Sequence, residues 1–456
     1  MTKIMIVIFV AITSSLWSLG QTTADTNLKF LISKIKAVYA GYPYKTTDAQ
    51  FDRIVKEPFS KPYPDSFVQL SRITTFFSDA HLALYQVFSN PDTTSCFSNR
   101  KIMAASARQP HLTKYEGYWV NDLGDQIIQM ISDKNGVLNG YIIETRLSAP
   151  VGLKVLSLYR DSTGWLADVT RLDYKYRVVT RSYMRNDSVL ICGYQAKWRK
   201  VKLYKPGLLN LIPVSEKYPS LRVLDSNTIL IRMPDFDGSL FPIYDSLLKA
   251  NKIVLSQAKT LILDVRNNIG GSISNIEPIT PYVCTAPLYL FGSLRRSSEE
   301  ALNEALQSRD RFKQRGDTIT MKLFDKYIDG LKKATGGFYE LESDTLVCES
   351  TPNSIRNVGI ITNYAAVSAV ELMILYYKQS PKVKLFGEAT GGVVDYLNAI
   401  YLRMPSPGLL LMVATAKRKL VSGFGSYDGK GIPPDVPIPD SEKDWVLFTK
   451  RFYEKN

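Results

Sequence analysis

The sequence predicts an α/β fold class, with a helical N-terminal region and an inserted antiparallel β domain that precede the α/β core. Three observations predict it. Apolar residues recur at helical spacing near the N-terminus, short alternating segments follow, and continuous Val/Ile/Leu runs alternate with helical stretches from about residue 213 onward. A chain of 456 residues has room for roughly two or three domains.

The N-terminal 20 residues have the layout of a secretory signal peptide. Lys3 precedes an apolar run at 4–12, and small and polar residues follow as far as Gly20. A short membrane anchor is the alternative, but the run is well under the ~20 residues that span a bilayer. No cysteine follows for lipid attachment, and no later stretch is long and apolar enough to span a membrane. We expect a soluble, exported protein, periplasmic or extracellular.

Residues 21–112 are predicted to form a helical region that carries His81. Apolar side chains recur at helical spacing between Leu28 and Tyr39, and Thr47 offers an N-cap for a second, short helix. The other histidine of the chain, His111, reads as a linker residue.

Residues 113–206 are predicted to form an antiparallel β module, either a barrel or a sandwich. Short alternating segments are separated by turn sequences at Asp133 and Asp161. Its aromatic residues are most simply the core of this module, and they include Tyr118, Trp119, Trp165 and Trp198.

Residues 207–456 are predicted to form the α/β domain. The apolar runs at 228–231, 260–265, 358–362 and 383–386 are typical of strands that are covered on both faces. The charged segment 298–335 favours helices and is expected to leave the sheet as an excursion.

Composition excludes several function classes. Lys and Arg number 57 against 43 Asp and Glu, a formal charge of +14, but the basic residues lie in short scattered clusters. We therefore expect solvated faces and no nucleic-acid partner. Four distant cysteines and two histidines cannot supply the ligand spacing of a zinc site, so no metal is expected. At most one or two disulfides could form.

Two turns after predicted strands could carry chemistry. In the first, Asp264 is followed by an Asn-Asn and Gly-Gly turn at 267–271, whose backbone amides could bind an oxyanion. An ordinary loop is the alternative. In the second, Ser368 begins an apolar helix, where amide donors and the positive helix end suit a developing negative charge. A simple helix cap is the alternative there.

Four motifs together resemble the tail-specific (C-terminal processing) serine peptidases. They are Arg-Asn-Asn-x-Gly-Gly at 266–271, Ser-Ala-x-Glu at 368–371, Phe-Gly-Glu-Ala-Thr-Gly-Gly at 386–392 and Asp-Gly-Lys-Gly-Ile-Pro-Pro-Asp at 428–435. The resemblance covers about residues 220–440. It implies a ClpP/crotonase-like α/β core that cleaves polypeptide substrates.

The resemblance also assigns roles. Ser368 is implied as the nucleophile, and the oxyanion hole is implied to use the amide of Ala369 together with that of Gly271 or Gly270. Many members place a catalytic lysine where this chain has Val393, so a serine–lysine pair is not expected. No organic cofactor is implied.

A second branch, tricorn-like and interphotoreceptor-retinoid-binding-protein-like, pairs the serine with a histidine. The segment at 78–82 resembles its Asp-x-His-Thr motif, with Leu82 in place of the small polar residue. His81 is therefore expected to be the base. Asp428 occupies the expected acidic position, Asp395 is the rival acid, and the two glutamates Glu371 and Glu388 are expected to be structural.

The expected function is therefore that of an exported serine endopeptidase of the Ser-His-acid type. No PDZ-like carboxylate-binding loop precedes the core, so recognition of a free C-terminus is not expected. Two alternatives remain at this point: an inactive peptidase-like module that binds peptides or apolar ligands, and an esterase that uses the same residues. The sequence leaves the oligomeric state open.

Overall fold

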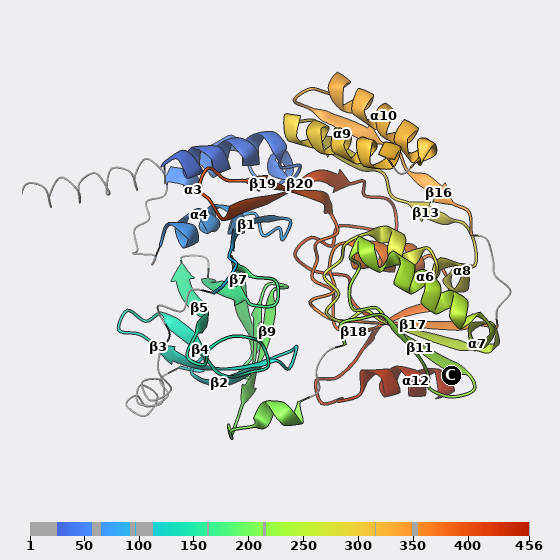
Figure 1. Ribbon diagram of the computed structural model, residues 1–456, viewed down its shortest axis with the longest axis horizontal. Helices are drawn as coiled ribbons and strands as arrows, with labels where there is room; N and C mark the ends of the chain where they lie inside the picture. Colours follow the sequence, from blue (N-terminus) through green and yellow to red (C-terminus); the bar gives the residue numbers. More distant parts are fainter. Residues whose placement is uncertain are drawn as a thin grey trace, which may run out of the picture.

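The computed structural model describes residues 25–56, 65–91, 96, 113–161, 164–212, 216–314, 316–348 and 354–455. The expected signal peptide and His111 lie outside these residues. The described part has a helical layer and a β-barrel on one side, a second sheet with its helices on the other, and long strands between them (Figure 1). None of its helices combines the length and apolar character needed to cross a bilayer.

The N-terminal layer is helical, as predicted. Residues 25–38 form one helix, and the helices that follow are α2 (Tyr42–Lys45), α3 (Asp48–Lys56) and α4 (Ser66–Thr75). Thr47 caps α3. Its hydroxyl accepts a hydrogen bond from the backbone amide of Gln50 at 3.3 Å, and the Gln50 side-chain oxygen accepts one from the backbone amide of Thr47 at 3.0 Å. The apolar face of this layer is buried, with Leu31 and Phe51 fully covered.

The β module is a closed antiparallel barrel, which decides between the two predicted forms. Each strand pairs with the next, and the last pairs with the first. Trp119 and Trp198 are buried in its core, whereas Tyr118 stacks outside the core on Tyr204. The strands are β2 (Gly117–Asn121), β3 (Gln126–Ser132), β4 (Leu138–Thr145), β5 (Lys154–Asp161), β6 (Gly164–Arg171), β7 (Tyr176–Asn186), β8 (Val189–Cys192) and β9 (Ala196–Val201).

The α/β core contains a six-stranded sheet, parallel except for its first strand. Its order is β10 (Ser220–Val223), β11 (Thr228–Arg232), β12 (Thr260–Asp264), β17 (Asn357–Thr362), β18 (Val383–Gly387) and β21 (Val436–Pro437). Successive residues of β12 point to opposite faces of the sheet, and an apolar cluster covers each face. Leu261 belongs to the larger of these two clusters, whereas Ile262 belongs to the smaller one, together with Trp445. This double burial explains the continuous apolar runs.

Helices cover both faces of this sheet. The larger cluster includes residues of α6, α7, α8 and α11, and the smaller cluster includes residues of α12. The helices of the core are η2 (Gly238–Leu240), α6 (Phe241–Ala250), α7 (Lys252–Gln257), η3 (Ile273–Ile276), α8 (Thr280–Val283), α11 (Ala369–Tyr377) and α12 (Trp445–Lys455). The short helix η1 (Leu208–Leu211) instead bonds to the barrel, because the Leu209 amide donates to Glu144 at 3.1 Å.

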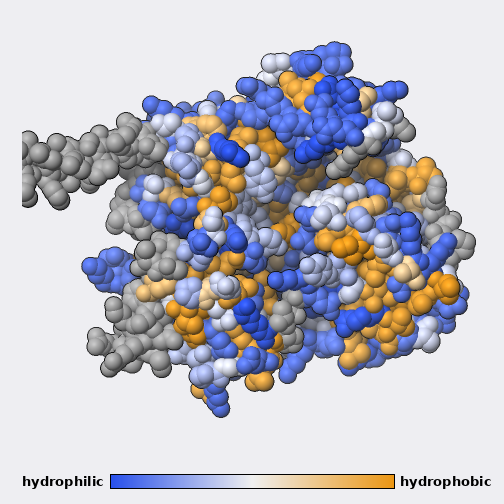
Figure 2. Space-filling view, viewed as in Figure 1, coloured by the Kyte–Doolittle hydropathy of each residue, from blue (hydrophilic) through white to orange (hydrophobic). Residues whose placement is uncertain are grey.

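The predicted excursion is a pair of helices, α9 (Glu299–Gln314) and α10 (Thr318–Lys333), which lie at the top right of Figure 1 and present a largely hydrophilic surface in Figure 2. Short strands lead into and out of the pair: β13 (Leu288–Leu290), β14 (Ser293–Arg296), β15 (Phe338–Leu341) and β16 (Asp344–Leu346). A disulfide between Cys284 and Cys348 ties the base of the excursion together.

Three strands join the parts of the molecule. β1 (Leu82–Val87) pairs with β7 of the barrel and with β20 (Leu409–Arg418), and β20 also pairs with β19 (Tyr396–Arg403). Because β1 begins directly after His81, these pairings hold that histidine against the C-terminal half of the chain.

Candidate active site

Two loops meet at the carboxyl ends of the parallel strands β12 and β17. Two asparagines connect the loop at 266–271 to the loop at 363–368. The backbone amide of Asn267 donates to Asn363 Oδ1 at 3.0 Å, and the side-chain Nδ2 of Asn363 donates to Asn267 Oδ1 at 2.8 Å. A methyl group on Gly270 would lie 2.8 Å from Ser368 Cβ, so only glycine permits this approach.

Ser368 has a backbone conformation that is rare for any residue with a side chain. Its φ is 61° and its ψ is −119°, and the Val370 amide donates to the Val367 carbonyl at 3.3 Å. These values match the first central position of a type II′ turn, which favours glycine. Such strain concentrates at functional sites. Ser368 is also the N-cap of α11, as the alternative to a chemical role expected.

Glu371 supports this turn from beneath. Its carboxylate is fully buried and accepts the amide of Ser368 at 3.0 Å, the amides of Gly392 and Val393 at 2.8 Å each, and the Thr390 hydroxyl at 2.5 Å. Burial raises its pKa to about 7, although these hydrogen bonds favour the ionised form. Glu371 thus fixes the serine turn to the 388–393 loop.

The backbone amides around Ser368 differ in what they bind. The Gly270 amide donates to Asn268 Oδ1 at 2.9 Å. The amides of Gly271 and Ala369 have no hydrogen-bond partner within the described ranges. Of the two candidate glycines, Gly271 is therefore the one whose amide is free among the described residues.

His81 is held by two hydrogen bonds. Its amide donates to Asp79 Oδ1 at 2.8 Å, and its ring Nδ1 lies 2.6 Å from the carbonyl oxygen of Tyr396. A carbonyl oxygen can only accept, so Nδ1 carries the proton of the neutral ring. The Nε2 lone pair then remains available as a base.

These groups line one cavity of about 650 Å³. His81, Ser368 and Val393 border it, as do three residues of the expected oxyanion hole, Gly270, Gly271 and Ala369. A helical N-terminal segment and two loops of the core thus contribute to a single cleft.

The expected contact between Asp428 and His81 is replaced by other contacts. Asp428 Oδ2 forms an ion pair with Lys45 Nζ at 2.5 Å, and its other oxygen is buried with no hydrogen-bond partner among the described residues. Burial raises the pKa of Asp428 to about 6, against the opposing effect of Lys45. The orienting role of Asp428 stays a prediction, and in this structure the Tyr396 carbonyl accepts the hydrogen bond of the ring Nδ1.

The rival acid is also engaged elsewhere. Asp395 forms a buried ion pair with Arg418 at 2.6 Å and accepts the Ser426 hydroxyl and the amides of Tyr427 and Asp428. These bonds make it an anchor for the 426–428 turn. Neither acid bonds to His81 in the part of the chain that the structure covers.

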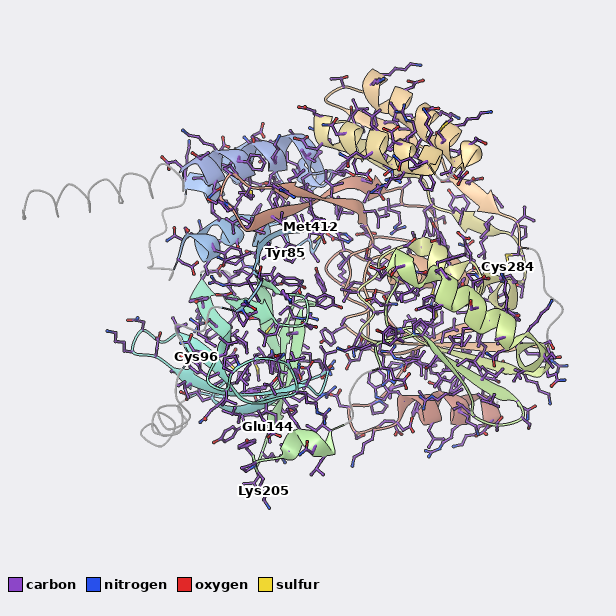
Figure 3. All side chains as sticks on the ribbon, viewed as in Figure 1. Tyr85, Cys96, Glu144, Lys205, Cys284 and Met412 are labelled. Carbon is purple, nitrogen blue, oxygen red and sulfur yellow. A yellow bond between two sulfur atoms is a disulfide. The ribbon has the colours of Figure 1, made fainter. Side chains whose placement is uncertain are left out.

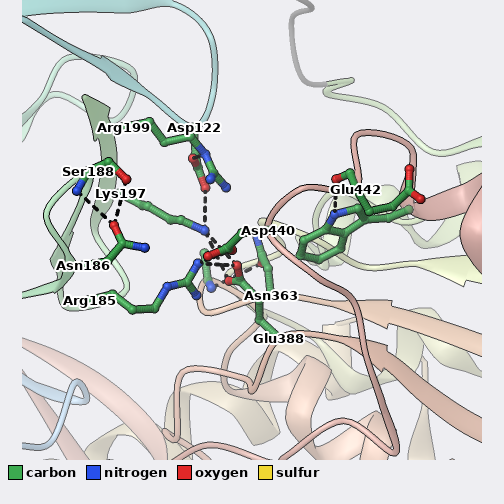
Figure 4. A network of polar contacts seen from close by, with 12 residues as sticks. Asp122, Arg185, Asn186, Ser188, Lys197, Arg199, Asn363, Glu388, Asp440 and Glu442 are labelled. Carbon is green, nitrogen blue, oxygen red and sulfur yellow. Dashed lines mark hydrogen bonds and ion pairs between the residues drawn. The ribbon is translucent and has the colours of Figure 1, made fainter. Parts of the chain in front are cut away.

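The barrel contacts two loops next to Ser368, the loop at 363–368 and the loop at 388–393. Lys197 of β9 is fully buried, and its ammonium lies 2.9 Å from Glu388 Oε1 and 5.2 Å from the centre of the Tyr364 ring. Arg185 of β7 also donates to Glu388, at 3.0 Å (Figure 4). The charges of Lys197 and Arg185 hold the pKa of Glu388 below its ordinary value, although burial alone would raise it.

Comparison with known proteins agrees with this architecture. Residues 227–438 match the model of Peptidase family S41. No curated protein matches the sequence. Mature CPAF has a similar fold at 11% identity, with 95% of this chain and 96% of that chain covered and a TM-score of 0.50.

Two further solved structures are similar. CPAF complexed with lactacystin shares 12% identity over 95% of this chain and 97% of that chain, with a TM-score of 0.50. A putative peptidase from Parabacteroides merdae shares 12% identity over 94% and 96%, with a TM-score of 0.45. Residues 227–438 thus resemble peptidase family S41, and the two CPAF structures share the fold of this chain.

Proposed function

We propose that this chain is an exported serine endopeptidase in which Ser368 is the nucleophile and His81 the general base. The observation that carries the proposal is the orientation of His81 in the cavity that Ser368 lines: with Nδ1–H donated to Tyr396, the neutral ring presents Nε2 as its proton acceptor. The Tyr396 carbonyl takes the orienting role that an acid has in a triad.

The reaction then follows the course of acyl transfer. Ser368 Oγ attacks the scissile carbonyl while His81 Nε2 takes its proton. The amides of Gly271 and Ala369 stabilise the oxyanion, a contribution of about 100- to 1,000-fold in rate per donor. His81 passes the proton to the leaving amine, and water hydrolyses the acyl-enzyme by the same route.

Export rests on the N-terminal sequence and on the cysteines. The layout of residues 1–20 favours a cleaved signal peptide. The Cys284–Cys348 disulfide suits an oxidising compartment, where such bonds persist. N-terminal sequencing of the mature protein tests export: a new terminus close to Gly20 is expected, and an intact Met1 in the secreted fraction would contradict cleavage.

Activity measurements on an unfolded protein substrate test the mechanism. Ser368→Ala and His81→Ala should each abolish hydrolysis while the circular dichroism spectrum stays that of the wild type. A fluorophosphonate should label wild-type Ser368, and labelling should need His81. An unlabelled serine in a folded protein would instead indicate a module that binds peptides without cleaving them.

Asp428→Asn is the matched control for the orienting role. In a serine–histidine–aspartate triad the corresponding change lowers kcat about 10,000-fold. Because Asp428 pairs with Lys45 here, we expect a loss of less than about tenfold in kcat. A decrease in kcat of about 10,000-fold would instead show that Asp428 orients His81.

A further inference from the structure

One wall of the active-site cavity is built from tyrosine rings. Five residues form it, and we call them the tyrosine wall: Tyr85, Tyr174, Tyr176, Tyr194 and Tyr401. The ring centres lie 6.3 Å apart between Tyr401 and Tyr85, 4.9 Å between Tyr85 and Tyr176, and 6.1 Å between Tyr176 and Tyr174. The rings therefore form one aromatic surface across β19, β1 and the start of β7.

The two ends of this surface are open to solvent. Tyr401 is 61% exposed and Tyr174 is 45% exposed, whereas Tyr85, between them, is buried. Tyr85 belongs to the same buried cluster as Met412, which also lines the cavity; both are labelled in Figure 3. The rest of the lining adds aliphatic surface from Val87, Ile269, Ile273, Leu372, Leu397 and Leu410. Open aromatic surface beside a nucleophile is suited to holding an apolar group.

The hydroxyl groups of the wall are largely used within the protein. Those of Tyr85 and Tyr194 bond to each other at 3.2 Å, and that of Tyr176 donates to Gln195 at 2.7 Å. The wall therefore offers ring surface more than polar contacts.

A strand edge borders the same cavity. Of the strands that the structure describes, only β20 pairs with β19. Leu397, Asn398, Ala399 and Tyr401 of β19 line the cavity. The unpaired edge of a strand can hydrogen-bond an extended peptide, which then adds a strand to the sheet.

We propose that the cleft binds its substrate as an extended strand along β19, with a large apolar or aromatic side chain against the tyrosine wall next to the scissile bond. This inference rests on the proposed endopeptidase function and names the substrate class. Aromatic pairs add about 0.5–1.5 kcal/mol beyond burial of area, so one such side chain changes affinity about two- to tenfold.

Charged groups act in both directions on a cationic side chain at the wall. Arg171 lies over the Tyr174 ring, 4.8 Å from its centre, and would repel a second cation there. Two carboxylates, Asp235 and Asp237, also line the cavity, so a preference for lysine is the competing outcome of the test.

Binding is measured in the Ser368→Ala variant, so that the result does not depend on turnover. Fluorescence anisotropy compares three labelled nine-residue peptides that differ only in a central Phe, Ala or Lys. The Phe peptide should bind about three- to tenfold more tightly than the Ala peptide. Adding Tyr401→Ala or Tyr174→Ala should remove that advantage, whereas Tyr218→Ala, at a 70% exposed tyrosine outside the cavity, should keep it.

Backbone pairing has its own test. One peptide series carries N-methyl groups at the odd positions and another at the even positions. Because successive amides of a strand point to opposite sides, only one of the two series should bind more weakly. Equal effects on both sets, or tighter binding of the Ala or Lys peptide, would overturn the inference. Wild-type enzyme that binds the Phe peptide as expected but cleaves no peptide would overturn the proposed function instead.

Discussion

Lys197→Met is the sharpest test of how the barrel supports the catalytic core. The substitution keeps the length of the side chain and removes its charge. Lys197 has 1% of its side chain exposed, and its partners Glu388 and Asp122 have 10% and 12%. Breaking a buried pair by removing one partner costs about 3–5 kcal/mol, because the other charge stays buried. Arg185 remains on Glu388, so we expect about 3 kcal/mol.

Urea unfolding at pH 7 measures this cost, and Lys202→Met, at an exposed site just beyond β9, is the matched control that should stay within about 0.5 kcal/mol. The double variant Lys197→Met/Glu388→Gln should be more stable than additivity predicts, by about 2 kcal/mol. The reasoning is refuted if Lys197→Met costs less than 1 kcal/mol, or if the two substitutions are additive.

Three further predictions concern the serine turn, the disulfide and Asp428. Gly270→Ala should lower peptide hydrolysis at least about 100-fold by displacing Ser368, whereas Gly316→Ala, at a similar positive φ but in open space, should leave it within about twofold; similar activities in the two variants would contradict the packing argument. Replacing Cys284 and Cys348 by Ala should lower the free energy of unfolding by about 4 kcal/mol, since the bridge spans 64 residues; an unchanged Tm would exclude this. The pKa of Asp428 is raised from 3.8 to about 6, so the folded state binds its proton more tightly than the unfolded state and stability falls as pH rises through that interval. Relative to Asp428→Asn, the wild type should lose about 2.4 kcal/mol between pH 4 and pH 7 in urea titrations, and a difference that does not vary with pH would refute the assignment.

The loops of the candidate site could be predicted from the sequence, because each has distinctive residues directly after an apolar strand. Ser368 and the glycine turn at 267–271 follow apolar runs, and parallel pairing of β12 with β17 brings them together. The helical layer could be predicted from the spacing of its apolar residues. All of these signals lie within short segments of the chain, so the sequence alone contains them.

What could not be predicted depends on contacts between distant residues. The barrel and the sandwich differ in whether β2 pairs with β9, which no single strand reveals. The Tyr396 group that holds His81 is a carbonyl, which every residue has, so it leaves no trace in the sequence. Lys45 was missed for a related reason, because its pairing with Asp428 joins opposite ends of the chain. Glu371 was expected to be structural, and its four hydrogen bonds agree, but the sequence does not reveal its position beneath the Ser368 turn.

The double pairing of β1 has a consequence for biosynthesis. Leu82 pairs with Val413, and Tyr85 pairs with Val178, so the strand behind His81 is in place only when residues from three regions have met. Contacts of such long sequence separation form late, because the entropy of closing the loop must be met first. A chain emerging from the ribosome holds His81 long before it holds Ser368. Under the proposed mechanism the nascent chain is therefore latent, and it cannot cut neighbouring chains until its own fold is complete.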